Sequence, residues 1–138
     1  TGKGYYAACH LAAADYKEKI KEFEFINRMD MAYAAADVVI SRAGAISISE
    51  MCVVKKAVVL VPSPNVAEDH QTKNAMALVN KHAAVLVTDA DSREKLVKES
   101  IHLLRNKILC NELVKNIGKL AMPDADEKIV EQINLLLQ

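Results

Sequence analysis

Two short, continuous apolar runs constrain the fold of this chain most strongly. They are Ala57–Val61 (AVVLV) and Ala83–Val87 (AAVLV), and a helix-like stretch from Asp69 to Asn80 separates them. An uninterrupted apolar run of this length is typical of a strand that is buried on both faces of a parallel sheet. A third β-branched run, Val38–Ile40, precedes them. Strands that alternate with helices predict an α/β fold, a Rossmann-like parallel sheet with helices on both faces.

The remaining elements follow from apolar spacing and from start and stop signals. We expect a β-like run at 23–26 and further helices at 5–20, 29–36, 45–54, 92–105, 107–120 and from Pro123 onward. In the last of these helices, Asp124 and Glu127 have the spacing of an N-cap residue and its N3 partner. At 138 residues, the chain is predicted to form one domain over residues 1–138.

Composition argues against several classes of function. The 18 basic and 18 acidic side chains cancel, whereas a nucleic-acid-binding protein normally carries a basic excess or stripe. No apolar run approaches the length of a membrane span. The three cysteines and four histidines show no metal-ligand spacing, so neither a metal nor another cofactor is expected. The chain starts at Thr1 without a Met, and we therefore expect a fragment of a longer protein.

The segment Asp37–Glu50 (DVVISRAGAISISE) predicts a binding site for phosphate. A strand is followed by a small turn that contains Gly44, and then by a helix. This order aims free backbone N–H groups and the positive end of the helix dipole at one point, which suits an anion. Arg42 adds a planar, permanently charged fork that fits a phosphate or diphosphate. The alternatives are that Arg42 is a surface or ion-pair arginine and that Gly44 is an ordinary turn glycine.

Glu50 also has two interpretations. It is the only charged residue between Ala43 and Val54, and its carboxylate can accept hydrogen bonds from hydroxyls such as those of a ribose. Alternatively, Ser47 and Glu50 form a capping box and merely mark the start of a helix. A helix that starts at Ser47 would leave a long loop after the strand, so we favour the ligand-binding interpretation.

More polar segments are expected at the same edge of the sheet, because ligands of open α/β sheets bind beyond the carboxyl ends of the strands. The segments are 25–27, 41–45, 62–69 and the helix start that carries His70 and Gln71. Within Glu68–Gln71 an acid/base pair is conceivable, but acids at a helix start usually interact with its dipole. We therefore expect a helix cap and a polar ligand contact there, not catalysis.

Two stretches resemble a known family: FINRMDMAYAAADVVISRAGAISISE, which begins at Phe25, and VPSPNVAEDHQTKNA, which begins at Val61. They are similar to the C-terminal domain of the MurG family, bacterial transferases that use UDP-N-acetylglucosamine (UDP-GlcNAc) to convert lipid I to lipid II in peptidoglycan synthesis. The resemblance implies the donor-binding C-terminal half of an inverting hexosyltransferase of the GT-B type. It also implies that the acceptor site, the catalytic base and the membrane-associating surface lie in an N-terminal half that this chain lacks. This fragment is then expected to hold no catalytic residue and to be inactive alone.

The resemblance assigns residues to three parts of the donor. Those beside the nucleoside are Phe25 and Ile26 at the uracil ring and Glu50 at the ribose hydroxyls. Arg42 matches the arginine near the diphosphate, and the turn and helix start over the nucleotide are matched by Gly44, Ala45, Ile46 and Ser47. Those facing the donor sugar are His70 and Gln71, where some relatives have two glutamines. Gly2 lies in an early loop that approaches the nucleotide. One departure is Lys55-Lys56-Ala57, where relatives commonly have Gly-Lys-Pro.

The implied partners are UDP-GlcNAc as donor and lipid I as acceptor, the latter through the missing domain, with no nucleic acid. The implied location is the cytoplasm, peripheral on the inner membrane through the same missing domain, with roles in cell-wall biogenesis, cell division and cell shape. Three alternatives stay open. They are another GT-B transferase that uses a different nucleotide sugar, a non-catalytic nucleotide-sugar-binding subunit, and a purely structural Rossmann-like module.

Overall fold

The structure is a computed structural model that describes residues 3–66 and 69–137, so the predicted positions Gly2 and Glu68 lie outside the described residues. The chain divides into two compact units, Thr1–Ala35 and Ala36–Gln138. Each unit is described by itself. The single domain expected over residues 1–138 stays a prediction.

The first unit contains three helical elements among its described residues: α1 (Lys3–Ala12), a 3-10 helix (Ala14–Tyr16) and α2 (Met29–Ala35). The prediction of α2 is confirmed, but the helix predicted over 5–20 is wrong beyond Ala12. Ala13 is the one described residue of this unit that is buried. Since most helical stability in proteins comes from packing an apolar face, this unit offers little to extend α1.

The strand predicted at 23–26 is also wrong, because these residues adopt no regular secondary structure. A strand needs a hydrogen-bonded neighbour to satisfy its backbone groups. Among the described residues, the three strands pair only with one another, and none of them lies in the first unit. Phe23 and Phe25 are accordingly exposed.

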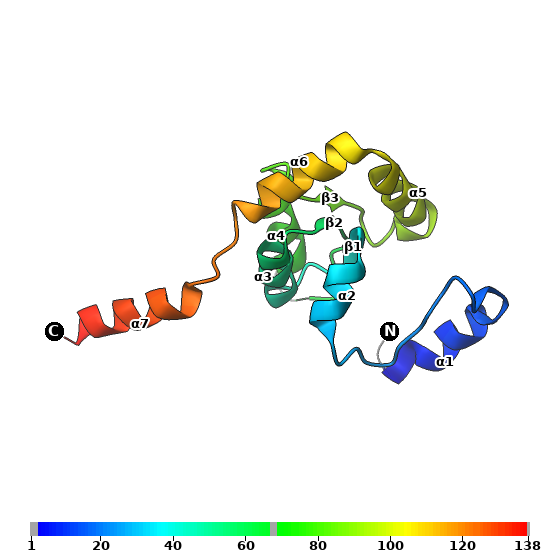
Figure 1. Ribbon diagram of the computed structural model, residues 1–138, viewed down its shortest axis with the longest axis horizontal. Coiled ribbons are helices and arrows are strands. Elements are labelled where there is room, and N and C mark those ends of the chain that lie inside the picture. The colour runs from blue at the N-terminus through cyan, green and yellow to red at the C-terminus, as the bar shows by residue number, and fades with distance from the viewer. Residues whose placement is uncertain (1–2, 67–68, 138) are drawn as a thin grey trace. The chain divides into compact units, whose positions relative to one another are not determined.

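The second unit contains a three-stranded parallel sheet in the order β1-β2-β3, as Figure 1 shows. Its elements in chain order are β1 (Val38–Ser41), α3 (Ala45–Val54), β2 (Ala57–Leu60), α4 (His70–Val79), β3 (Val85–Leu86), α5 (Ser92–Arg105), α6 (Lys107–Gly118) and α7 (Ala125–Leu136). Strands and helices alternate as the sequence predicted, and the α/β, Rossmann-like fold is confirmed. The predicted bounds of α3 and α5 agree with the structure, whereas β3 is shorter than the predicted 83–87.

The sheet has its most buried strand in the middle. In β2 every residue is completely buried, as the continuous apolar run predicts. β1 pairs with β2 from Val38↔Ala57 to Ser41↔Leu60, and β2 pairs with β3 at Val59↔Val85 and Leu60↔Leu86. All three strands therefore end at the same edge, which is the edge where a ligand of such a sheet binds.

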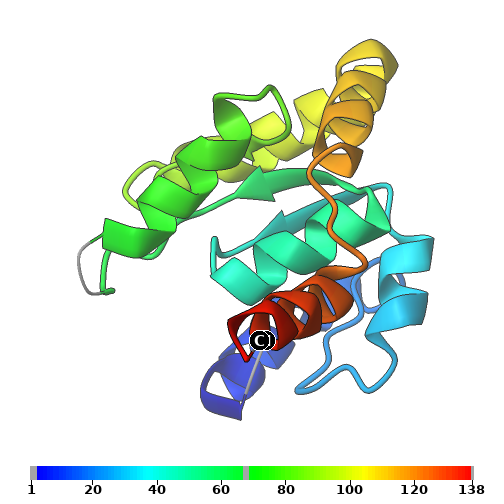
Figure 2. The ribbon, with the colours of Figure 1, turned by 90° about the vertical axis from the view of Figure 1, so that its left-hand side faces the viewer.

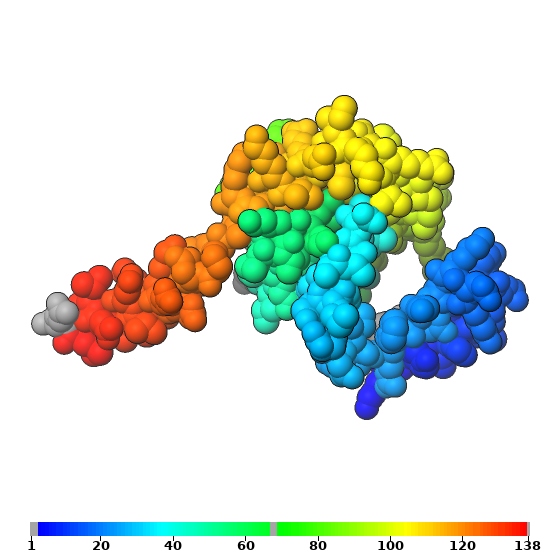
Figure 3. All heavy atoms as spheres, in the orientation of Figure 1, coloured from blue at the N-terminus to red at the C-terminus, as the bar shows by residue number. Residues whose placement is uncertain are grey.

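Helices cover both faces of the sheet. On one face, Ala57, Val59 and Val61 pack against Leu103 of α5 and Leu113 of α6. Because side chains alternate along a strand, Val58 and Leu60 point to the opposite face. Right-handed crossovers from β1 to β2 and from β2 to β3 place α3 and α4 on that opposite face, and Figure 2 shows α3 running alongside the strands. In Figure 3 the atoms of α5 and α6 form one continuous surface along the top of this unit.

The final helix, α7, begins after Asp124, as predicted, but the predicted cap does not form. The Asp124 side chain makes no capping hydrogen bond and instead pairs with Lys128 Nζ at 2.9 Å. The hydrogen bond from Lys128 lowers the pKa of the Asp124 carboxyl. No described residue of α7 is buried, so its apolar side chains, among them Ile129 and Ile133, are exposed.

Candidate functional site

The turn between β1 and α3 has the geometry of an anion-binding site. Gly44 is the N-cap residue of α3, and the first intrahelical bond runs from Ile48 N to Gly44 O at 3.0 Å. The N–H groups that precede Ile48 in the helix therefore have no acceptor within it. Ala45 and Ile46 are exposed, and the first turn of α3 contains no acidic residue. The positive end of the helix is thus open to solvent at the edge where the strands end.

The position of the helix start decides between the two interpretations of Glu50. Since α3 begins at Ala45, Ser47 lies inside the helix and cannot be its N-cap residue. The capping-box alternative is therefore wrong. Glu50 lies on α3 and is exposed, so its carboxylate is accessible, while its role toward a ribose stays a prediction.

The backbone conformation of the ligand-free protein does not require a glycine at position 44. Its φ is −67°, in the extended region that any residue adopts. A Cβ added at this position would meet only Ser47 Oγ within 4 Å, at 3.8 Å, which is an ordinary contact. Neither strain nor crowding requires a glycine here. The physical reasons that remain are the preference for glycine at an N-cap and close approach of a ligand to the backbone.

Arg42 directly follows β1 and is held by three oxygen atoms. Its Nη1 donates to Asp89 Oδ1 at 2.5 Å, to Val61 O at 3.2 Å and to Pro62 O at 3.3 Å. The Arg42 side chain keeps 55% of its surface exposed. This is the ion pair of the alternative interpretation, but among the described residues it engages one of the three guanidinium nitrogens, Nη1. A guanidinium has five N–H donors, so a diphosphate contact stays compatible with it.

Asp89, the partner of Arg42, was not predicted from the sequence. It follows β3 in a loop that is fixed by local hydrogen bonds. Ser92 Oγ donates to Asp89 O at 2.7 Å, and Thr88 Oγ1 donates to Asp91 Oδ2 at 2.9 Å. Hydrogen bonds from Lys95 and Thr88 lower the pKa of the Asp91 carboxyl. The sequence did contain an indication that Asp89 belongs to the site. Asp89 comes just after a predicted strand, at the edge where ligand-binding loops gather.

Gln71 connects the loops that follow β1 and β2. Its Oε1 accepts hydrogen bonds from Ser63 N at 2.8 Å and from Ala43 N at 3.3 Å. Because both neighbours are N–H groups, the amide must present its oxygen to them, and only Nε2 remains to donate to a ligand. The predicted contact of Gln71 with a sugar is limited to that one group.

Asn74, one turn further along α4, was also not predicted as a site residue. Its Nδ2 donates to Ala43 O at 3.2 Å. The spacing of three residues places Asn74 and Gln71 on the same face of α4. The H-Q-x-x-N-A pattern contains both residues and therefore indicates that Asn74 lies beside Gln71.

His70 is the first residue of α4 and is exposed. Asp69, the N-cap residue, has a left-handed backbone with φ 55°, and its side chain makes no capping hydrogen bond. The cap expected within Glu68–Gln71 thus falls on Asp69 by position, without a side-chain hydrogen bond. Phe25 and Ile26 belong to the first unit, where 77% of Phe25 and 38% of Ile26 is exposed.

A cavity of about 340 Å³ opens at the edge where β2 and β3 end. Its lining is mostly apolar and includes Pro62, Leu86, Thr88 and Asp89, the last of which pairs with Arg42. This edge thus combines a cation, an open helix N-terminus and a hollow within one unit.

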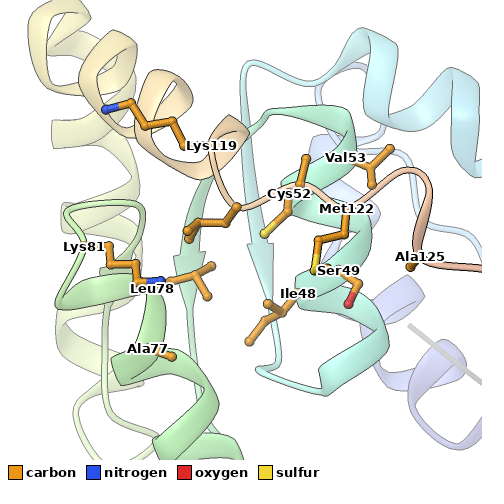
Figure 4. A pocket seen from close by; sticks show the side chains of 12 residues that line it. Ile48, Ser49, Cys52, Val53, Ala77, Leu78, Lys81, Lys119, Met122 and Ala125 are labelled. Atoms are coloured by element: carbon orange, nitrogen blue, oxygen red, sulfur yellow. The ribbon is translucent and has the colours of Figure 1, made fainter. Parts of the chain in front are cut away.

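A second cavity, of about 520 Å³, shares no lining residue with the predicted site. Figure 4 shows it with Leu78 of α4 on one side and Ile48 and Cys52 of α3 on the other. The lining is mostly apolar. Burial raises the pKa of the Cys52 thiol, and the nearby Lys81 charge opposes this effect.

The structure holds no pre-assembled metal ligands in its described residues, since no three His, Cys, Asp or Glu side chains come together there. Within residues 3–66 and 69–137, no helix combines the length and the apolar character that crossing a bilayer requires.

Parallel strands, helices on both faces and a strand–turn–helix at the carboxyl edge define an α/β domain of the Rossmann-like class. The sequence profile of the glycosyltransferase family 28 C-terminal domain matches residues 1–129, and the chain belongs to this family.

Curated relatives and a crystal structure agree with this membership. The chain is 50% identical over 133 residues to the UDP-N-acetylglucosamine–N-acetylmuramyl-(pentapeptide) pyrophosphoryl-undecaprenol N-acetylglucosamine transferase of Cytophaga hutchinsonii, covering 96% of this chain and 35% of the relative. It is 47% identical to the transferase of the same name from Porphyromonas gingivalis, covering 100% of this chain and 37% of the relative. The crystal structure of Acinetobacter baumannii MurG superposes with a TM-score of 0.84 at 30% identity, covering 96% of this chain and 39% of that one. The chain thus spans about a third of the length of these relatives.

Proposed function

We propose that this chain is the donor-binding domain of a glycosyltransferase that moves N-acetylglucosamine from UDP-GlcNAc to lipid I, which forms lipid II. The names of the similar transferases support this reaction. Acceptor binding, the catalytic base and attachment to the cytoplasmic face of the inner membrane are assigned to parts of the protein outside this chain. Because the chain spans about a third of its relatives, activity belongs to the whole protein.

The observation that carries this proposal is the exposed start of α3 beside Arg42. An open helix N-terminus whose first turn lacks an acid suits a diphosphate. Gly44 supports the same function, since neither its φ nor its surroundings require a glycine in the free protein. Glu50 lies further along the same helix and is exposed, where its carboxylate can accept hydrogen bonds from ribose hydroxyls.

In the proposed reaction, this domain stabilises the leaving group. As the bond between the sugar and UDP breaks, negative charge grows on the diphosphate and the donor carbon gains oxocarbenium character. Arg42 and the N–H groups of Ala45, Ile46 and Ser47 would stabilise that charge without needing to reorganise. His70 and the Nε2 of Gln71 would orient the sugar. The roles of Phe25 and Ile26 at the uracil ring stay predictions from the family resemblance.

Calorimetric titration with UDP and UDP-GlcNAc tests the proposal. We expect Arg42→Ala and Glu50→Ala to weaken UDP binding roughly ten- to a hundredfold, the effect of losing one charge-assisted hydrogen bond. Arg105→Ala and Glu112→Ala are matched controls, because both residues are exposed and lie outside the site. Equal affinities in the site variants and the controls would refute the assignment. Competition by UDP-glucose or UDP-GalNAc as effective as that by UDP-GlcNAc would favour a related transferase with another donor.

A further inference from the structure

The backbone of Ala43 is buried in a turn that belongs to neither a strand nor a helix. Ala43 is completely buried and lies between Arg42 and Gly44, the two residues that the proposed site uses most. Buried backbone N–H and C=O groups need hydrogen-bond partners. Neither the β1–β2 pairing, which ends at Ser41, nor the α3 ladder provides partners for Ala43.

Both partners come from α4. Gln71 Oε1 accepts from the Ala43 N–H at 3.3 Å, and Asn74 Nδ2 donates to the Ala43 carbonyl at 3.2 Å. Gln71 also holds Ser63 N at 2.8 Å, which ties the same helix face to the loop after β2. The side chains of Gln71 and Asn74 are both partly buried, where a hydrogen bond to the backbone is harder for water to replace.

We propose that Asn74 is a positioning residue for the diphosphate-binding turn. With Gln71 it holds both polar groups of Ala43, so that the N–H groups at the start of α3 stay aimed at the ligand. This inference rests on the nucleotide site proposed above. Asn74 acts on UDP binding through Ala43, so its effect on UDP affinity depends on whether its side chain donates a hydrogen bond to the Ala43 carbonyl.

Two isosteric substitutions separate the effect of hydrogen-bond direction from the effect of an added negative charge. Gln71→Glu and Asn74→Asp each replace an amide by a carboxylate of the same size on the same face of α4, and each adds one negative charge. Gln71→Glu keeps an oxygen opposite two N–H groups, whereas Asn74→Asp places an oxygen opposite the Ala43 carbonyl oxygen. UDP is the probe, because it lacks the sugar that Gln71 is proposed to contact.

We expect both substitutions to weaken UDP binding slightly through charge repulsion, and Asn74→Asp to weaken it roughly tenfold more than Gln71→Glu. Asn74→Ala, which adds no charge, should also weaken it several-fold. Thermal unfolding of each variant shows whether it is folded at the temperature of the titration. Equal losses in Gln71→Glu and Asn74→Asp, or a lowered melting temperature with unchanged UDP affinity, would overturn the positioning role.

The hydrogen bonds by which Gln71 and Asn74 hold the Ala43 backbone form a clamp. Hydrogen exchange of the full chain without nucleotide tests this clamp separately. In Gln71→Met, which removes the acceptor, the amides of Ala43 and Ser63 should exchange at least about tenfold faster than in the wild type. In Gln71→Glu they should stay slow. Unchanged exchange in Gln71→Met would refute the clamp itself. If the amides respond as expected but the wild type binds no UDP, the nucleotide site and the positioning role are wrong, while the clamp stands as a structural connection.

Discussion

Substitution of Gly44 by alanine tests whether this glycine is needed for ligand binding or for folding. The backbone at Gly44 has a φ of −67°, and an added Cβ would meet only Ser47 Oγ, at 3.8 Å. The folded protein therefore has both the conformation and the space for an alanine. If the glycine exists to let a phosphate approach the backbone, the methyl group should act on binding and leave the fold intact.

The expected change in stability follows from two opposing effects. Alanine is a poorer N-cap residue than glycine, at a cost of about 0.5–1 kcal/mol. Replacing glycine also reduces the conformational entropy of the unfolded chain, which stabilises the protein by about 0.4–1 kcal/mol. The two nearly cancel, so the melting temperature should shift by no more than about 2 °C. Loss of one charge-assisted hydrogen bond costs about 1.5–3 kcal/mol, so UDP affinity should fall roughly ten- to a hundredfold.

Calorimetric titration with UDP and thermal unfolding together check this prediction. Gly118→Ala is the matched control, because its Cβ would meet the Lys55 side chain at 3.3 Å and Gly118 lies outside the site. The control should change the melting temperature while it leaves UDP affinity unaltered. A Gly44→Ala protein that binds UDP as the wild type does would refute the close-approach argument. A large loss of stability would instead show that the turn needs its glycine for folding.

Three further predictions concern stability. Lys55 caps the end of α3 with a left-handed backbone, φ 53°, so Lys55→Gly should stabilise the protein by about 0.5–1 kcal/mol in denaturant unfolding; Lys55→Ala, which keeps the Cβ, should bring no gain. Burial raises the pKa of the Cys52 thiol, so its contribution to stability is complete below the ordinary thiol pKa of about 8.5 and is lost as the pH rises through the raised value; unfolding measured across this range should show a smaller alkaline loss in Cys52→Ala. Leu103 is completely buried against the sheet, so Leu103→Ala should cost about 2–5 kcal/mol by thermal or denaturant unfolding, and a cost below 1 kcal/mol would contradict the packing.

The parts of the fold that the sequence predicts well are those fixed by local patterns. The apolar run at β2 and the composition of α3 and α5 gave the right elements, because burial on both faces and helical spacing are written in neighbouring residues. The 23–26 run failed for the opposite reason. Its composition favours a strand, but among the described strands none pairs with it, and a strand without a partner leaves its backbone unsatisfied.

Lys55 shows how a departure from the family pattern is accommodated. The family resemblance leads us to expect glycine at this position, and Lys55 takes the left-handed conformation that a glycine adopts without cost. The aliphatic part of its side chain lies 3.3 Å from the Cβ position of Gly118, so a residue on α6 without a side chain leaves room for it. Lys55 thus closes α3 at the cost of a strained backbone, and the neighbouring helix makes room for its side chain.

The sequence predicted the local part of the candidate site, but not which atoms its long-range hydrogen bonds join. A strand, a glycine turn and a helix start are adjacent in sequence, so the anion-binding geometry of residues 42–47 could be read locally. The pairing of Arg42 with Asp89 joins residues 47 positions apart, and only the sheet brings their loops together. Gln71 was predicted to face a ligand, yet its oxygen holds the backbone of two loops. A polar side chain at a sheet edge can bind a ligand or fix the loop that binds it. Only the hydrogen-bond partner of each atom decides between these roles. The spacing therefore places Asn74 beside Gln71, but only the structure shows what Asn74 holds.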